Sequence, residues 1–227
     1  MIERQELQML KDKGYKFDDP FDVIKIFEKK ISDYTGAPYV TVTDCCTHSL
    51  ELCLRYKLKN GESIDSIALP NKTYLSVPMT CYKLGIAVQF TQEDWKGYYK
   101  LGDTNILDMA LRFTKDCYVP GSESCLSFGN KKVVRINRGG AILTDDKDAH
   151  EYYQLARYDG RDLSKRPWGT QESFPVIGYH YNLSCEDCAR GILLMDKLAE
   201  NGTHNKDAAD NVQDFYPDLS KLDLNLI

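Results

Sequence analysis

The chain has 227 residues, of which 42% are hydrophobic and 28% are charged, a composition typical of a soluble globular domain that buries one sizeable core. A formal net charge of −5 argues against a general nucleic-acid binder, whose affinity rests on excess Lys and Arg facing phosphates. No apolar run approaches the ~20 residues of a membrane span, and the opening residues lack the order of a signal peptide. We therefore expect a cytoplasmic protein that binds small molecules rather than nucleic acid or membrane.

The eight cysteines are scattered, and several lie within apolar stretches, which favours reduced thiols over disulfides. Cys185 and Cys188 form a C-x-x-C pair, and Cys45 and Cys46 are adjacent. The first pair lies in a helix-like run with no nearby His, and adjacent cysteines are poor chelators. We therefore expect no metal site.

The first half of the chain alternates between strand-like and helix-like segments. Apolar residues at helical spacing over 21–34 stop at Thr35-Gly36, which predicts an amphipathic helix. The predicted elements that follow are strands at 39–43, 66–69 and 86–90 and helices at 49–58 and 75–84. This alternation predicts a three-layer α/β/α fold with a mostly parallel sheet and ligands at the carboxyl ends of its strands.

The second half predicts further short elements and the domain limits. The expected elements are strands at 105–108 and 124–128, a hairpin-like pair at 133–136 and 141–144, and helices at about 148–158 and 185–199. Residues 161–174 are polar and read as a loop, and the residues from 205 onward read as a loosely packed tail. We expect an N-terminal arm over 1–20, one large domain over 21–200 and a tail over 201–227.

Three short segments carry residues suited to chemistry. The turn at 44–49 includes Thr47 and precedes a predicted helix, where backbone N–H groups favour an anion. Asp108 closes a predicted strand, and Ser127 is followed by Lys131 and Lys132. Taken singly, each has an ordinary structural explanation, as a helix N-cap or as a solvated turn.

The order of these segments resembles the DegT/DnrJ/EryC1/StrS family of pyridoxal-phosphate-dependent, fold type I sugar aminotransferases, over about residues 18–195. The strongest match is Ser127-Phe128-x-x-x-Lys132 followed by Gly139-Gly140, which is similar to the family's S-F-H-x-x-K and E-G-G segments. That register selects Lys132 over Lys131. Weaker matches lie at 27–36, 42–50, 67–74, 84–90, 106–110, 158–162 and 178–184.

The resemblance implies a role for each matching residue. Lys132 would form a Schiff base with the aldehyde of pyridoxal 5′-phosphate and then move a proton as general base and acid. Asp108 would keep the pyridine nitrogen protonated. The remaining cofactor-binding residues would be Cys46, Thr47 and Ser127 on the phosphate, Tyr74 on the ring, and His180 and Asn182, which match a stretch that reaches the other subunit's cofactor. A homodimer is thereby implied, although His180 is nearly as well explained as an ordinary surface or core histidine.

The reaction implied by the resemblance transfers an amino group from an amino acid, glutamate or glutamine, to a keto sugar carried by a nucleotide. Only sixteen residues separate Phe90 from Leu107, where the family inserts a helix and a strand, and little follows the helix near Met195. We expect a compressed large domain without most of the C-terminal small domain. Two alternatives stay open: another reaction of the same cofactor, such as dehydration or decarboxylation in a specialised pathway, or a non-catalytic scaffold.

Overall fold

The computed structural model describes residues 4–165, 168–200 and 215–221. Its elements, in chain order, are α1 (Gln5–Asp12), α2 (Asp22–Thr35), β1 (Tyr39–Thr43), α3 (Cys46–Lys59), β2 (Ser66–Pro70), α4 (Ser76–Lys83), β3 (Ala87–Thr91), β4 (Tyr99–Lys100), β5 (Ile106–Asp108), β6 (Glu123–Ser127), β7 (Gly140–Thr144), α5 (Lys147–Ala156), η1 (Trp168–Thr170), α6 (Cys185–Glu200) and η3 (Leu219–Lys221). The predicted alternation of strands and helices is confirmed, and α1 is an additional helix within the expected arm.

The described strands form a five-stranded sheet in the order β1-β7-β6-β5-β4 and a separate two-stranded sheet of β2 and β3. The β5–β6 and β2–β3 pairs are parallel, whereas β7 runs antiparallel to both of its neighbours and β4 runs antiparallel to β5. The α/β class is confirmed, with a mixed sheet. The three strands β1, β5 and β6 share one direction, so their carboxyl ends meet at one edge.

The expected hairpin between 133–136 and 141–144 is wrong. Residues 133–136 form no strand, and β7 pairs instead with β6 on one side and β1 on the other. The backbone N–H of Ile136 donates to the carbonyl of Phe128, so the loop satisfies its polar groups locally. Val134 and Ile136 are buried in the core, and a short apolar run of this kind has the same pattern whether it is a strand or a buried loop.

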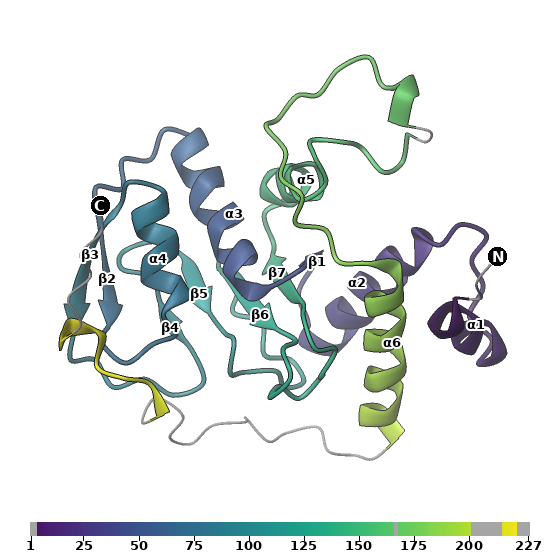
Figure 1. Cartoon of the computed structure of the whole chain (residues 1–227), viewed down its shortest axis with the longest axis horizontal. Helices are drawn as coiled ribbons and strands as arrows, with labels where there is room; N and C mark the ends of the chain where they lie inside the picture. Colours follow the sequence, from purple (N-terminus) through teal and green to yellow (C-terminus); the bar gives the residue numbers. More distant parts are fainter. Residues whose placement is uncertain (1–3, 166–167, 201–214, 222–227) are drawn as a thin grey trace.

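The core is divided between the two faces of the sheet. Successive side chains of a strand point to opposite faces, so Ala141 and Leu143 of β7 pack with α1, α2 and α6, while Ile142 packs with α3, α4 and α5. In Figure 1, α1, α2 and α6 lie together at the right of the view, and α3 and α4 lie to the left. This arrangement gives the three layers that the alternation predicted.

A buried ion pair anchors the strand that leads into the candidate site. Arg157, 2% exposed, pairs with Glu28 of α2, and its guanidinium also donates to the carbonyl of Val42 at 2.8 Å. Glu28 in turn accepts from the N–H of Val42 at 3.0 Å. The end of β1 is therefore held between α2 and the helix that precedes Arg157.

One helix terminus matches its sequence signal and another does not. α2 ends at Gly36, whose φ of 80° is left-handed and favours glycine, as the Thr35-Gly36 stop predicted. α3 starts at Cys46 rather than near Ser49, so the turn after β1 is shorter than expected.

Within 161–174, predicted as a loop, the described residues are irregular apart from η1. None of the helices in the described ranges combines the length and apolar character that a bilayer crossing requires.

Candidate active site

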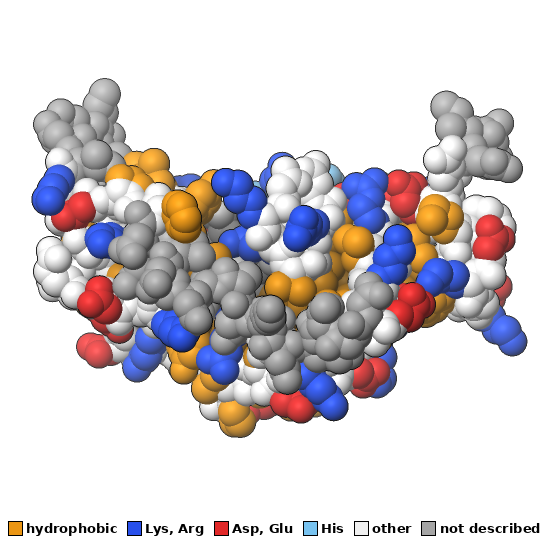
Figure 2. Space-filling view, turned by 90° about the horizontal axis from the view of Figure 1, so that it is seen from below, with side chains coloured by type: hydrophobic (Ala, Val, Ile, Leu, Met, Phe, Trp, Pro, Cys, Tyr) orange, Lys and Arg blue, Asp and Glu red, His pale blue; other side chains and the backbone are white. Residues whose placement is uncertain are grey.

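Most of the predicted site residues meet at the carboxyl edge of the main sheet. β5 ends at Asp108 and β6 ends at Ser127, while Cys46 and Thr47 open α3 directly after β1. This edge faces the lower side of Figure 1, and Figure 2 shows that face, with Lys and Arg side chains spread over it among hydrophobic and acidic ones. Ligands of α/β proteins bind at such edges.

Asp108 is a buried carboxylate with fixed orientation. It is 6% exposed, one oxygen accepts from the hydroxyl of Tyr99 at 2.9 Å, and the other accepts from the N–H of Ala110 at 2.9 Å. The Tyr99 hydroxyl also shares a 2.5 Å hydrogen bond with Thr73. Burial raises the pKa of Asp108, although these hydrogen bonds and the charge of Lys132 act in the opposite direction.

Lys132 is a partly buried amine in the electrostatic field of that carboxylate. Burial lowers the pKa of Lys132, and the negative charges that Cys46 and Asp108 can carry partly offset this effect. With the described part of the chain its amine forms neither a hydrogen bond nor an ion pair. Lys132 is half-buried and its charge interacts with those of Asp108 and Cys46, whereas Lys131 is exposed.

The turn that starts α3 is packed tightly against β7. A Cβ on Gly140 would lie 2.5 Å from the carbonyl carbon of Cys45 and from the nitrogen of Cys46, so only glycine allows this approach. Gly140 also pairs with Ser127 in the β6–β7 ladder. The N–H groups of the first turn of α3 thus lie beside the Ser127 end of β6, an arrangement suited to an anion.

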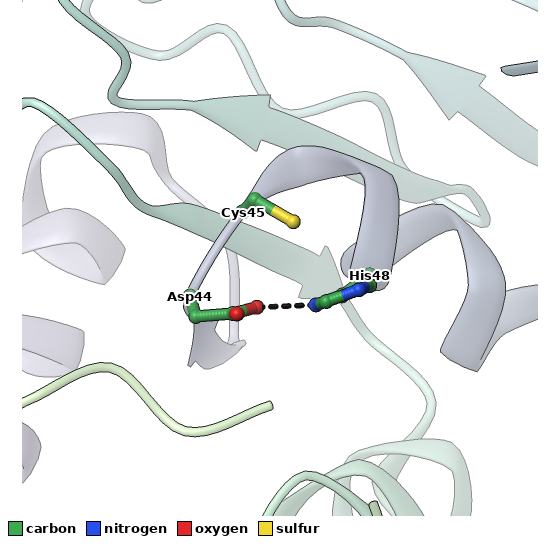
Figure 3. Close-up of side chains that lie close together, drawn as sticks. All are labelled: Asp44, Cys45 and His48. Atoms are coloured by element: carbon green, nitrogen blue, oxygen red, sulfur yellow. Dashed lines mark hydrogen bonds and ion pairs between the residues drawn. The ribbon is translucent and has the colours of Figure 1, made fainter. Parts of the chain in front are cut away.

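Two cationic side chains converge on this turn, and sequence reasoning did not select either. One oxygen of Asp44 bonds to His48 at 2.5 Å (Figure 3). The other oxygen accepts from the Arg138 guanidinium at 2.6 Å. The His48 ring stacks on Tyr181, with centroids 3.6 Å apart. Burial alone would lower the pKa of His48, but the hydrogen bonds to Asp44 and Cys45 raise it to about 9. The i,i+4 spacing of Asp44 and His48 was the available sequence signal.

The same turn contains the one set of three possible metal ligands among the described residues. The ligand atoms of Asp44, Cys45 and His48 lie within 4.8 Å of one another. Both oxygens of Asp44, however, already bond to cationic side chains, and His48 is protonated at neutral pH. This charge distribution suits an anion at the start of α3 better than a metal ion.

Thr47, Ser127 and Tyr74 line the same region with less constraint. The Thr47 hydroxyl shares a 2.7 Å hydrogen bond with that of Ser76, at the start of α4. Ser127 is half-buried at the end of β6, and Tyr74 is 61% exposed. Two hydroxyls and one accessible aromatic ring are therefore available to a ligand at this edge.

Among the described residues, His180 and Asn182 form no hydrogen bond with Lys132, Asp108 or Cys46. His180 lies 3.2 Å from a carboxylate oxygen of Asp159, and its side chain is 77% exposed. The side-chain oxygen of Asn182 is buried and without a hydrogen-bond partner among the described residues. The expected contact with a second subunit stays a prediction.

Comparison with known proteins adds to this geometry. The sequence matches the DegT/DnrJ/EryC1/StrS aminotransferase family over residues 3–99 and 119–223. The chain belongs to this aminotransferase family. It is 28% identical over 81 residues to GDP-perosamine synthase of Caulobacter vibrioides, a match that spans 36% of this chain and 20% of the relative.

Solved structures share the fold of this family member. AtS13 from Actinomadura melliaura superposes with a TM-score of 0.68 at 16% identity, over 86% of this chain and 65% of that one. Helicobacter pylori PseC, an aminotransferase involved in the biosynthesis of pseudoaminic acid, superposes with a TM-score of 0.67 at 16% identity, over 88% and 64%. The chain thus spans about two thirds of these structures and matches about a fifth of the curated relative.

The residues of this family member fit pyridoxal phosphate by their chemistry. A buried carboxylate suits a pyridinium, a partly buried amine with a lowered pKa suits an aldehyde, and the N–H groups and cations around the start of α3 suit a phosphate. The turn at Cys45 and Cys46 lies directly against Gly140, in space that the Cβ of any other residue would occupy.

Proposed function

We propose that this chain binds pyridoxal 5′-phosphate at Lys132 and transfers an amino group from an amino acid to a keto sugar. The observation that carries the proposal is the buried Asp108 carboxylate, which Tyr99 and the Ala110 N–H orient at the end of β5 and whose charge acts on the half-buried Lys132 amine. The family and the sugar-modifying relatives support it.

Lys132 supplies the nucleophile and the mobile proton. Its lowered pKa increases the fraction of neutral amine, the form that attacks an aldehyde and accepts a proton. The bound cofactor supplies that aldehyde and a ring that accepts electrons from the reacting carbon. Asp108, oriented by Tyr99 and the Ala110 N–H, stabilises the protonated ring nitrogen.

The start of α3 holds the cofactor phosphate in this proposal. Backbone N–H groups at Cys46 and Thr47 and the hydroxyls of Thr47 and Ser127 are the donors. The charges of His48 and Arg138 add to the positive potential of the helix N-terminus. Tyr74 contributes an aromatic surface for the ring.

The amino donor in the proposal is glutamate or glutamine, and the acceptor is a keto sugar linked to a nucleotide. The name of the Caulobacter relative, GDP-perosamine synthase, supports a nucleotide-linked acceptor. In this proposal the protein acts in the cytoplasm as a homodimer. His180 and Asn182 of one subunit face the cofactor phosphate of the other subunit. The His180 side chain is 77% exposed and therefore accessible to a second subunit.

The test is the visible absorption spectrum of the purified protein with added pyridoxal phosphate. Wild type is compared with Lys132→Ala, and Lys131→Ala is the matched control because Lys131 is exposed and adjacent. We expect a protein-bound visible band in wild type and in the control that is absent in Lys132→Ala. Loss of that band on addition of glutamate, with formation of 2-oxoglutarate, supports transfer. A band that persists in Lys132→Ala, or is absent from wild type, contradicts the assignment.

A further inference from the structure

Residues 215–221, named here the strap, lie against the second sheet, well away from α6 along the chain. The N–H of Leu219 donates to the carbonyl of Asn71 at 2.8 Å, directly after β2, and Leu219 is 1% exposed. Hydrogen bonds from Ser220 and the Asn71 side chain lower the pKa of Asp218 to about 2. Figure 1 shows the strap in yellow below the ends of β2 and β3, on the side of the candidate site. The strap is thus anchored by both backbone and side chain.

The strap places an aromatic side chain next to the cofactor-binding residues. The ring of Tyr216 lies edge-on to that of Tyr74, with centroids 6.4 Å apart, and nearly parallel to Trp95 at 6.3 Å. Trp95 in turn contacts Tyr99 at 4.9 Å, and Tyr99 donates to Asp108. A continuous line of aromatic contacts therefore joins the strap to the carboxylate.

The electrostatic environment of Tyr216 agrees with this position. Burial, followed by the charges of Asp108, Tyr74 and Cys46, raises the pKa of Tyr216 to about 12. Those three residues belong to the proposed cofactor site. The neighbouring Phe215, in contrast, is 85% exposed. Of these two consecutive aromatic side chains, only Tyr216 faces the site.

We infer that Tyr216 is a further cofactor-binding residue and that the strap covers the mouth of the site between Tyr74 and Trp95, retaining pyridoxal phosphate. The inference rests on the proposed function, since it names the cofactor of that site. The reason is physical: an aromatic ring beside Tyr74 excludes water from the apolar side of a bound ring and adds contact area. Release of the cofactor then requires the strap to leave Asn71.

The first measurement needs no cofactor. Amide hydrogen exchange of the cofactor-free protein reports whether Leu219 is protected by its bond to Asn71. We expect protection in wild type that is lost in Leu219→Ser, with unchanged protection of β6 showing that the large domain remains folded. An unprotected strap in wild type overturns the inference.

The second measurement is the rate at which bound pyridoxal phosphate is lost, for wild type, Tyr216→Ala and Leu219→Ser. Phe215→Ala is the control, because its side chain is exposed beside the strap residue under test. We expect both strap variants to lose cofactor about fivefold to tenfold faster, the size of effect that one aromatic contact supports, and the control to match wild type. Equal rates of cofactor loss in all four proteins would contradict the inferred role of the strap and leave the proposed function unaffected. A wild type that retains no cofactor overturns the proposed function as well, and the exchange data distinguish that case from a strap that is undocked.

Discussion

At the residue scale, burial moves the two proposed catalytic groups towards their neutral forms. The pKa of Asp108 is raised and that of Lys132 is lowered, both chiefly by burial. Ionisable groups whose pKa values are shifted in this way are typical of binding sites. A charged ligand stabilises the charged form of the group, which burial disfavours. The proposed cofactor, with a positive ring nitrogen and a negative phosphate, is a ligand of this kind.

Asp108→Asn tests this balance. A folded-state pKa above the unfolded value favours folding below the unfolded pKa, and that contribution is lost as pH rises through the folded value. We therefore expect the cofactor-free variant to be at least as stable as wild type at pH 7. The same variant should bind pyridoxal phosphate more weakly by about 1.5–3 kcal/mol, the range for a hydrogen bond to a charged group. Urea unfolding and a cofactor titration measure the two effects, and lower stability with unchanged affinity would contradict both.

His48 provides a pH-dependent test of the turn. Its pKa of about 9 lies above the unfolded value near 6.5, so its stabilising contribution is complete below about pH 6.5 and disappears as pH rises through 9. We expect His48→Asn to lower the free energy of unfolding by about 1–2 kcal/mol at pH 6 and by much less at pH 10. Unfolding in denaturant at both values measures this. A difference that stays constant with pH would mean that stacking on Tyr181, rather than charge, is what His48 contributes.

At the scale of elements, the contact between β7 and the start of α3 determines where an anion can bind. Gly140 lets the backbone of Cys45 and Cys46 lie directly against the strand, and Arg138 reaches Asp44 from the loop before β7. The anion-binding turn is therefore held by a neighbouring strand as well as by its own helix.

Gly140→Ala is expected to displace that turn. The new Cβ would lie 2.5 Å from two backbone atoms, which cannot move independently, so we expect a loss of about 1–3 kcal/mol in unfolding free energy together with weaker cofactor binding. Gly129→Ala is the matched control, because its nearest neighbour would be 3.7 Å away. Thermal unfolding and phosphate or cofactor titration compare the two variants. Equal stability would show that the turn accommodates a methyl group.

At the scale of the whole molecule, we propose that the site is shared between two copies of the chain. His180 contacts Asp159 and Tyr158, and its side chain is exposed to solvent. An exposed imidazole on a segment that follows a polar loop is available to a second subunit.

Mixing two inactive variants tests the shared site. Lys132→Ala removes the reactive amine, and His180→Ala removes the proposed contact to the other subunit's cofactor. A mixed dimer contains one site in which both residues are native, so we expect the mixture to regain up to a quarter or so of wild-type transfer activity, the statistical share of restored sites in a random mixture. Sedimentation or light scattering should show a dimer. Activity that is no greater in the mixture than in the separate variants, or a monomer in solution, would contradict the shared site.

Local signals in the sequence predicted most of the element types, and the resemblance to the family gave the order of the site segments and the selection of Lys132. Helical and strand periodicity, the Thr35-Gly36 stop and the register from Ser127 to Gly140 each depend on residues close together along the chain. The α/β class followed from the local signals, and the site that combines Asp108, Lys132 and Cys46 stays a prediction. Such signals carry this information because neighbouring residues share one local conformation.

Only the tertiary structure decided which strands pair and which distant residues meet. It placed β7 between β1 and β6, separated β2 and β3 from the main sheet, and joined Asp44 to Arg138, 94 positions away. It also brought Tyr216 to Trp95. These contacts depend on how buried faces pack and on which polar groups find partners inside the fold, and no local pattern encodes either.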